Sequence, residues 1–369
     1  MQQIDIAVVG AGPAGLSAAV EAANLGAKVL VLDENEKPGG QLFKQIHKFF
    51  GSREHRAGVR GMNLGAELLA EAAQAKAEIR LNSVVYGIYK DKRLGIIEQN
   101  QTSYMIEAKK IILAAGASEN ALSFPGCTLP GVMSAGAVQT MVNLHRVLPA
   151  QKTLMIGSGN VGLIVSYQIT QAGGEVVALL EAAPKIGGYG VHAAKISRAG
   201  VPILTRHTVK QVWGKQQVEG ATIVELDANF RPVPGSEKEV EVGCVAIAVG
   251  LTPLIELAQL CGCQFTFLPR MGGMLPIHNA DMETSVPGIY IAGDISGVEE
   301  ASTAMEEGRL AGIAAAESLG YIGQTDAAER KQHVWERMSK LRTGSFGSGR
   351  GDAKNNILAQ GEGFGCQRY

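Results

Sequence analysis

The sequence predicts an α/β fold with two Rossmann-like dinucleotide-binding domains, the second inserted into the first. Two observations lead to this prediction. A glycine-rich turn between an apolar run and a helical pattern occurs at residues 10–15, and the same pattern returns at residues 157–162. The chain has 369 residues, which is enough for two or three domains.

The first copy begins with a short, β-branched apolar run at residues 4–9, which is typical of a buried parallel strand. A helical pattern with one apolar face follows the glycine turn and stops at Gly26. A second strand is expected at residues 28–32, ending on Asp33 and Glu34. Strand, glycine turn, helix, strand and acid in this order form a complete dinucleotide-binding unit.

Each glycine of the first turn has its own role. Gly10 permits the tight turn, Gly12 leaves the backbone open to a pyrophosphate, and Gly15 lets helix and strand pack closely. The helix N-terminus offers free N–H groups and the positive end of its dipole to the phosphates. By its spacing Asp33 is the favoured acceptor for the adenosine ribose, with Glu34 close behind.

A polar-aromatic stretch at residues 43–50 follows Gly40 and Gln41. It is either a wall of the cofactor site, or a channel to it, or a surface helix with a satisfied histidine. A helix is expected around residues 64–75, then short strands to about residue 107, then a buried strand at 110–117. The small residues at the end of this last strand would let the chain pass close to a bound dinucleotide.

The second copy has a strand at residues 152–156, the glycine turn, a helix to 172 and a strand at 176–180. A glycine pair lies six residues past the acid in both copies. A nicotinamide nucleotide in this site would be NAD rather than NADP, because a carboxylate at Glu181 repels a 2′-phosphate. The residues expected to contact this nucleotide are Gly157, Gly159, Asn160, Val161, Gly162 and Glu181.

Beyond the second copy, strands are expected at residues 202–204, 209–213, 221–226, 244–249 and 287–294, with a polar hairpin around 232–238 and a helix at 302–319. The last strand closes on Gly293 and Asp294. From Lys340 onward the chain is rich in Gly, Ser, Arg and Asn. We expect this tail to be disordered, and a partner-docking arm is the alternative.

Composition excludes several classes of function. The net charge is −1, so there is no electrostatic basis for binding nucleic acid or an anionic membrane. No apolar run is long enough to span a bilayer, and the first strand starts too early for a signal peptide. The cysteines form no CxxC and no metal-ligand cluster, which favours a reduced, cytoplasmic protein. They are Cys127, Cys244, Cys261, Cys263 and Cys366.

With the Gly-Asp strand end in place, the chain resembles the FAD-dependent flavoproteins with two dinucleotide-binding domains. This pyridine nucleotide-disulfide oxidoreductase-like superfamily includes thioredoxin reductase and glutathione reductase. The resemblance rests on both glycine turns, the Leu-Ala-Ala-Gly116 strand end and Ala-Gly293-Asp294. It implies an FAD domain of residues 1–120 plus 255–325, an inserted NAD(P)-binding-like domain of residues 121–254, and a C-terminal helix and polar tail at 326–369.

The resemblance also implies a set of cofactor contacts. The Asp294 carboxylate would bond the flavin ribitol, and the helix after it would point its N-terminus at the pyrimidine end of the ring. The second domain would hold NAD or another adenine nucleotide. The implied FAD-binding residues are Gly10, Gly12, Pro13, Ala14, Gly15, Asp33, Glu34, Gly40, Gln41, Ala115, Gly116, Gly293, Asp294, Ala301, Ser302 and Thr303.

The sequence departs from the disulfide reductases of this superfamily in its cysteines. The paired cysteines that disulfide reductases place against the flavin are missing here, and the cysteines are too scattered to predict an iron–sulfur centre. Two stretches, Leu-Asp-Glu-Asn…Pro-Gly-Gly-Gln41 and Leu-Pro-Gly-Val-Met-Ser-Ala-Gly-Ala-Val-Gln139, resemble a narrower group. It comprises the A subunit of opine oxidase, the cyanide synthase flavin subunit, the dye-linked proline dehydrogenase α subunit and heterotetrameric sarcosine oxidase α.

In that group this type of chain is one subunit of a complex. The resemblance implies the flavin subunit of an amino-acid or amine dehydrogenase of proline, opine or sarcosine type, in a hetero-oligomer whose partner oxidises substrate or accepts electrons. The alternatives are a self-contained NADH-dependent flavin oxidoreductase and a flavin-bound scaffold or redox sensor. No side chain is assigned as a catalytic acid or base. His47, His55, His192 and His278 are candidates by type alone, and we expect them to be structural or on the surface.

Overall fold

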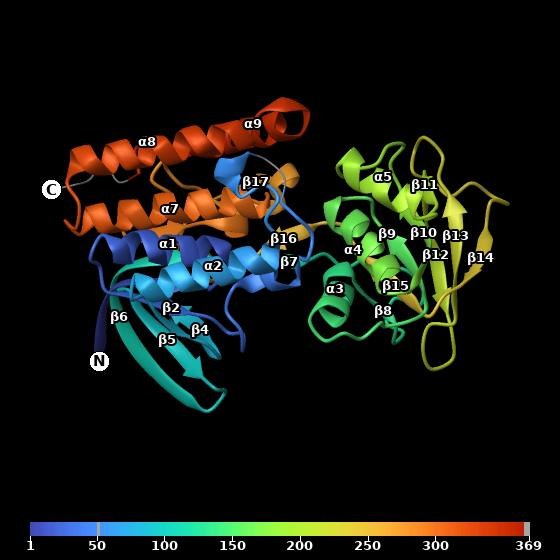
Figure 1. Ribbon diagram of the computed structural model, residues 1–369, viewed down its shortest axis with the longest axis horizontal. Helices are drawn as coiled ribbons and strands as arrows, with labels where there is room; N and C mark the ends of the chain where they lie inside the picture. Colours follow the sequence, from blue (N-terminus) through green and yellow to red (C-terminus); the bar gives the residue numbers. More distant parts are fainter. Residues whose placement is uncertain (50–51, 365–369) are drawn as a thin grey trace. The chain divides into compact units, whose positions relative to one another are not determined.

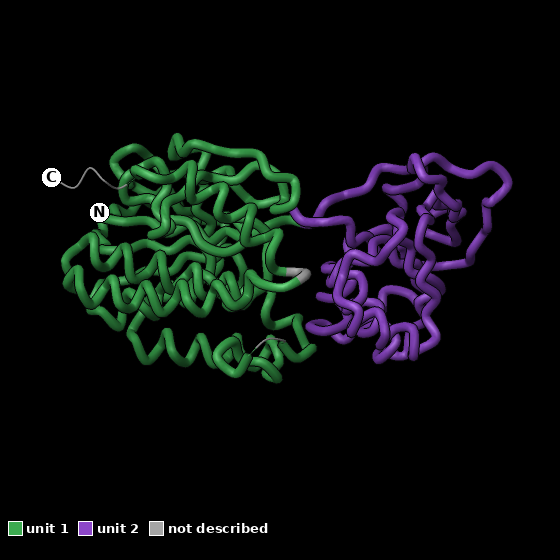
Figure 2. Tube along the Cα trace, turned by 90° about the horizontal axis from the view of Figure 1, so that it is seen from above, with its two compact units in different colours: residues 1–118, 252–369 green, residues 119–251 purple. Residues whose placement is uncertain are grey.

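The computed structural model describes residues 1–49 and 52–364, except for the side chains of residues 345 and 346. The chain forms two compact units, shown in Figure 2. The first unit comprises Met1–Ser118 and Thr252–Tyr369, and the second comprises Glu119–Leu251. The two chain connections include β7 (Ala117–Glu119) and β16 (Leu251–Pro253), which pair with each other. The α/β fold predicted from the sequence, with one unit inserted into the other, is confirmed.

The first unit is built on a mixed sheet whose parallel part carries the opening fingerprint. Long β6 pairs in parallel with β1 on one side and with β19 on the other, while its first half pairs antiparallel with β5. The strand order is β3 (Glu78–Arg80), β2 (Val29–Leu32), β1 (Gln2–Val9), β6 (Thr102–Leu113), β5 (Arg93–Glu98) and β4 (Ser83–Ile88), with β19 (Ile289–Ile291) beside β6.

Helix α7 (Ala301–Ser318) packs between α1 (Pro13–Asn24) and α8 (Gln324–Leu341), as Figure 1 shows. The contact between α1 and α7 is backbone against backbone. A Cβ at Gly308 or at Gly312 would overlap the carbonyl oxygen of Ala14 or of Ala18, respectively. Small residues therefore let the first helix of the chain lie directly on one of the last. Helix α2 (Gly61–Gln74) packs on α1 as well.

The second unit repeats the design with a five-stranded parallel sheet and a separate antiparallel sheet of three strands. The parallel order is β11 (Ile203–Thr205), β10 (Glu175–Glu181), β9 (Lys152–Ile156), β15 (Cys244–Ile247) and β8 (Val132–Ser134). The antiparallel strands are β12 (His207–Trp213), β13 (Gly220–Glu225) and β14 (Lys238–Glu241), and the helices are α3 (Ala135–Asn143), α4 (Asn160–Gln171) and α5 (Gly190–Arg198).

The prediction of a disordered tail from Lys340 is wrong for residues 340–364, the described part of this tail. Helix α8 continues to Leu341, and α9 (Gly344–Gly361) follows it. The physical reason is tertiary anchoring, because Ile357 is buried against Met271 and Leu275. Helix α9 contacts the short turn η3 (Pro269–Met271). This turn belongs to a segment that also contains α6 (Glu256–Leu260), β17 (Phe265–Leu268) and β18 (Gly273–Pro276).

The polar-aromatic stretch is not the surface helix that was one of its two interpretations. After the short 3-10 turn η1 (Gly40–Lys44), the chain runs irregularly to Phe49, and a second turn, η2 (Arg53–His55), follows. Phe50 and Cys366, both considered in the sequence analysis, lie outside the described residues. In the part of the chain that is described, no helix combines the length and the apolar character needed to cross a membrane.

Candidate functional site

The first glycine turn is tightly packed at Gly10 and Gly15 and open at Gly12. Gly10 has a φ of +105°, and a Cβ there would overlap the carbonyl oxygen of Ala114 at the end of β6. A Cβ on Gly15 would likewise overlap the carbonyl oxygen of Gly10. A Cβ on Gly12, in contrast, would meet no described atom within 4 Å. This open space at the start of α1 suits a pyrophosphate, which needs close approach to main-chain N–H groups.

Asp33 supports this turn from the end of β2. Its Oδ2 accepts the N–H of Ala11 at 2.6 Å, and its Oδ1 accepts the N–H and the side-chain amide of Asn35, each at 2.8 Å. Because each carboxylate oxygen has two lone pairs, Asp33 retains capacity for a ribose hydroxyl. Glu34, the second acid predicted for this role, is exposed.

The Gly-Gly segment lies across the same turn. The N–H of Gly39 donates to the carbonyl oxygen of Ala11 at 2.7 Å, and a Cβ on Gly40 would be 2.9 Å from the Cα of Gly12. Gln41, at the start of η1, is exposed. The two small residues predicted to cross the dinucleotide, Ala115 and Gly116, are partly buried just after β6.

The Gly-Asp motif at Gly293 and Asp294 lies beside the first glycine turn and the start of α1. A Cβ on Gly293 would be 2.9 Å from the Cβ of Ala14, although the two residues are far apart in sequence. Asp294 lies in the 3-10 turn η4 (Gly293–Ser296), where its carboxylate accepts the N–H of Glu299. Burial raises the pKa of Asp294 to about 6, with the neighbouring carboxylate of Glu307 acting in the same direction.

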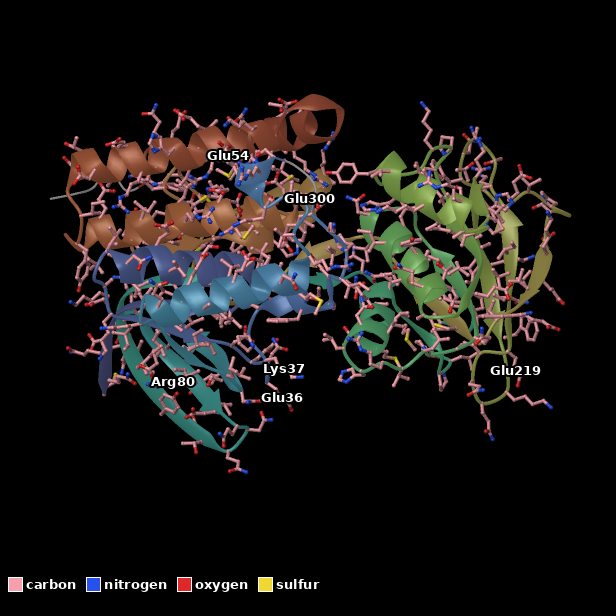
Figure 3. All side chains as sticks on the ribbon, viewed as in Figure 1. Glu36, Lys37, Glu54, Arg80, Glu219 and Glu300 are labelled. Carbon is pink, nitrogen blue, oxygen red and sulfur yellow. The ribbon has the colours of Figure 1, made fainter. Side chains whose placement is uncertain are left out.

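Helix α7 starts next to this turn, immediately after Glu300, which Figure 3 labels. Ser302 and Thr303 are buried and Ala301 is partly buried. The hydroxyl of Thr303 donates to the carbonyl oxygen of Glu300 at 2.7 Å. The motifs of the first unit therefore gather at the carboxyl ends of β1 and β19, where α/β sheets bind ligands.

The second fingerprint has the same geometry. A Cβ on Gly157 would overlap the carbonyl oxygen of Ala248, one on Gly162 would overlap that of Gly157, and one on Gly159 would meet no described atom within 4 Å. Glu181 accepts the N–H of Ser158, here at 3.1 Å. The open position and the acid are thus placed as in the first unit.

Ser158 is a candidate site residue that was not predicted from the sequence. Its hydroxyl donates to Glu181 and accepts the N–H of Gly187 at 2.9 Å. Its carbonyl oxygen accepts the N–H of Gly188 at 2.8 Å. Gly188 is therefore the counterpart of Gly39, one residue later than the spacing of the repeat predicts. The sequence did offer a signal for this role, since Ser158 places a hydroxyl at the second position of the glycine turn. Asn160 adds a further link, accepting the N–H of Tyr189 at 2.9 Å.

The four candidate histidines have structural surroundings. His55 is buried between the hydroxyl of Ser52 and the carbonyl oxygen of Arg337 in α8. His192 is buried next to Tyr189, and the ring of His47 lies 6.2 Å from that of Phe49. His278 is buried, which lowers its pKa to about 4.

The described cysteines are free thiols. Burial raises the pKa of Cys244 to about 11 and that of Cys261 to about 12, and it also raises the pKa of Cys263. Thiols with such pKa values are poor nucleophiles, because the thiolate is the reactive form. Among the described residues there is also no cluster of three or more His, Cys, Asp or Glu side chains that could hold a metal ion.

Residues 4–308 match the model of the family described as pyridine nucleotide-disulphide oxidoreductase. The A subunit of opine oxidase from Agrobacterium tumefaciens (strain Ach5) is 29% identical over 360 residues, covering 93% of this chain and 71% of the relative. The hydrogen cyanide synthase subunit HcnB of Pseudomonas aeruginosa is 27% identical over 360 residues, covering 91% of this chain and 75% of the relative.

Solved structures share the fold. The thioredoxin reductase of T. acidophilum superposes with a TM-score of 0.71 at 24% identity, covering 86% of this chain and 99% of that protein. The similarity extends over both units. The fold of the chain is therefore a known one.

Proposed function

The chain belongs to the pyridine nucleotide-disulphide oxidoreductase family, and we propose that it is the flavin subunit of a multi-subunit dehydrogenase of amino acids or amines, passing electrons to a partner. At the coarser level it is an FAD-dependent oxidoreductase. We assign FAD to the first unit and an NAD(P)-type site to the second. The oxidised substrate and the partner are the proposed parts.

One observation carries the proposal. Two relatives that each cover over nine-tenths of this chain are named as subunits, one of an opine oxidase and the other of a hydrogen cyanide synthase. Similarity over almost the whole chain makes the same organisation the simplest expectation here. The missing cysteine pair agrees with it, because a dithiol relay needs two reactive thiols, and burial raises the pKa of Cys244 to about 11 and that of Cys261 to about 12.

FAD supplies a centre that takes up a hydride equivalent and releases electrons one at a time. The residues of this chain bind and orient it. The first turn of α1 and the bare backbone at Gly12 would hold the pyrophosphate, and Asp33 the adenosine ribose. Asp294 would bind the ribitol. The N–H groups of Ala301 to Thr303 would stabilise negative charge at the pyrimidine end.

A second candidate is an NADH-dependent flavin oxidoreductase that needs no partner. The complete second fingerprint supports it, because Gly159 leaves open space at the start of α4 and Glu181, the proposed ribose acceptor, accepts the N–H of Ser158 in the same turn. In this alternative the hydride enters from NADH bound in the second unit, and the carboxylate of Glu181 disfavours NADPH.

The two candidates are separated by an anaerobic visible spectrum of the purified chain before and after NADH is added. Our proposal expects a flavin spectrum that NADH leaves unchanged. It also expects that proline, sarcosine or an opine bleaches the flavin only when the co-purified partner is present. Fast bleaching of the chain alone by NADH would contradict the proposal and support the alternative.

The variant Gly159→Val is the matched control. It blocks the open space of the second turn and leaves the first turn intact. If NADH bleaches the wild-type chain but not this variant, the hydride enters through the second unit. If both are bleached equally, the reduction does not use that site.

A further inference from the structure

A buried ion cluster links the C-terminal helices to the Gly-Asp turn. We define it as Glu299 and Glu307 with Arg342 and Lys354. The Nζ of Lys354 and a guanidinium nitrogen of Arg342 each lie 2.7 Å from Oε1 of Glu307. Arg342 also lies 2.6 Å from Oε2 of Glu299. All four side chains are at most 8% exposed.

The cluster holds both ends of the η4 turn. The second oxygen of Glu307 accepts the N–H of Gly293 at 3.0 Å and the hydroxyl of Ser296 at 2.7 Å. The Nζ of Lys354 donates to the carbonyl oxygen and to the hydroxyl of Ser296, both at 2.7 Å. Asp294 lies between these two anchored residues. Its backbone position is therefore set by an ammonium group located sixty residues further along the chain.

We propose that Lys354 is a positioning residue of the flavin site: from α9 it holds the turn Gly293–Ser296 in the conformation in which Asp294 meets the ribitol of FAD. This inference rests on the proposed function, since it presumes that the first unit binds FAD. Lys354 itself does not need to touch the cofactor.

The location of Lys354 is fixed independently of the turn. Ile357, one helical turn further along α9, is buried against Met271 and Leu275. The N–H of Val298, just after the turn, donates to the carbonyl oxygen of Met271 at 2.9 Å. Met271 thus contacts both the segment that follows the η4 turn and helix α9, which carries Lys354.

The charges of the cluster balance, with two carboxylates against two cations. Burial raises the pKa of Glu307, but Lys354 and Arg342 more than offset it, so its pKa lies below the ordinary range. Removal of one ammonium leaves an uncompensated buried carboxylate, whereas joint removal of Lys354 and the charge of Glu307 restores neutrality. This difference makes the role of Lys354 measurable by a double-mutant cycle.

The test uses the purified full chain with FAD bound. Lys354→Met, Glu307→Gln and the double variant are compared for FAD dissociation, followed by the rise in flavin fluorescence on dilution. Lys354→Met should raise the dissociation constant for FAD about tenfold or more, the scale of a lost charged hydrogen bond. The loss of FAD affinity in the double variant should be smaller than the sum of the losses in the two single variants, compared as free energies.

The control is Lys340→Met, which removes an equivalent side chain from α8. Lys340 pairs with Glu54, labelled in Figure 3, at 3.0 Å, and both side chains are more than half exposed. This variant should keep the dissociation constant within about twofold of wild type, since exposed ion pairs contribute little.

A thermal midpoint lowered in Lys354→Met with an unchanged FAD dissociation constant would make Lys354 merely structural and overturn the inference. If that variant is insoluble, Ser296→Ala decides, since it removes only the hydroxyl that Lys354 and Glu307 share. It should weaken FAD binding, and unchanged binding would again overturn the inference. A wild-type chain that binds no added FAD would instead refute the proposed function.

Discussion

The main-chain N–H of Ala11 donates to Oδ2 of Asp33 across 2.6 Å, although 22 residues separate them. Both residues are buried. The acid at the end of β2 therefore shapes the glycine turn, in addition to the ribose-binding role that we propose for it. In the second unit Ser158 and Glu181 form the same contact. In each unit, one carboxylate thus joins the glycine turn to the end of the second strand, two parts of the fingerprint that lie more than 20 residues apart in the sequence.

We predict that Asp33→Ala weakens FAD binding about tenfold or more, while Glu34→Ala changes it little. The first substitution leaves the buried N–H of Ala11 without its acceptor, which costs about 1–3 kcal/mol, and also removes the ribose acceptor. Glu34 is exposed and serves as the matched control. Fluorescence titration with FAD measures both variants. A larger effect at Glu34 would transfer the ribose role to that residue.

Substitution of two glycines should separate cofactor binding from folding. Gly12→Val places its side chain in open space, so the chain should fold and remain colourless. Gly15→Val forces a side chain onto the carbonyl oxygen of Gly10, so the thermal midpoint itself should fall. Flavin absorbance and circular dichroism give the two readouts. A yellow, fully loaded Gly12→Val protein would contradict the assignment of the FAD site.

Asp294→Ala should lower the flavin content of the purified protein, because it removes the carboxylate proposed to bind the ribitol. Asp294→Asn should retain more flavin, since an amide oxygen can accept hydrogen bonds in the same place. The absorbance ratio of flavin to protein after gel filtration measures both. Equal, full occupancy in the alanine variant would exclude Asp294 from the cofactor site.

Acid should destabilise the first unit through His278. Burial lowers its pKa from 6.5 to about 4, with Lys354 and Arg342 acting in the same direction and Glu307 opposing. Between these values the unfolded chain binds a proton that the folded chain does not. Stability is therefore full above pH 6.5 and falls as the pH drops towards 4. At pH 5 the loss is about 2 kcal/mol.

The measurement is urea unfolding at pH 7 and pH 5, followed by Trp335 fluorescence in a Trp213→Phe background, since the chain has two tryptophans. His278→Asn should lose less stability between these pH values than its parent. His145→Asn, at an exposed position, should behave like the parent. If all three proteins show the same pH dependence, His278 is not the titrating group.

The parts of the fold that follow periodicity could be predicted, and the parts held by tertiary contacts could not. Residues 152–156 form β9 as expected, because an apolar run before a glycine turn has few other outcomes. Helix α9 was missed because four glycines in its first eight residues give a poor intrinsic propensity. Burial of Lys354 and Ile357 overrides that propensity.

In the candidate site, too, local features could be predicted from the sequence and tertiary contacts could not. The spacing of Gly10, Gly12 and Gly15 predicts a turn that the geometry reproduces, because backbone space is a local property. No pattern in the sequence pairs Lys354 with Glu307, since their contact depends on how α7, α8 and α9 pack. The antiparallel strands β4 and β5 were foreseen only as short strands without a partner or register.

The insertion of the second unit also sets an order of events during synthesis. Residues 119–251 form one continuous segment, so this unit has its whole core before the first unit is complete. Until Ile289–Ile291 emerges, the last residues of β6 have no strand on the side away from β1, and Ala14 and Ala18 of α1 stay uncovered until α7 has followed. An uncovered apolar edge invites pairing with other chains. We therefore expect the nascent chain to be most prone to aggregate before residues 289–318, which form β19 and α7, have been made.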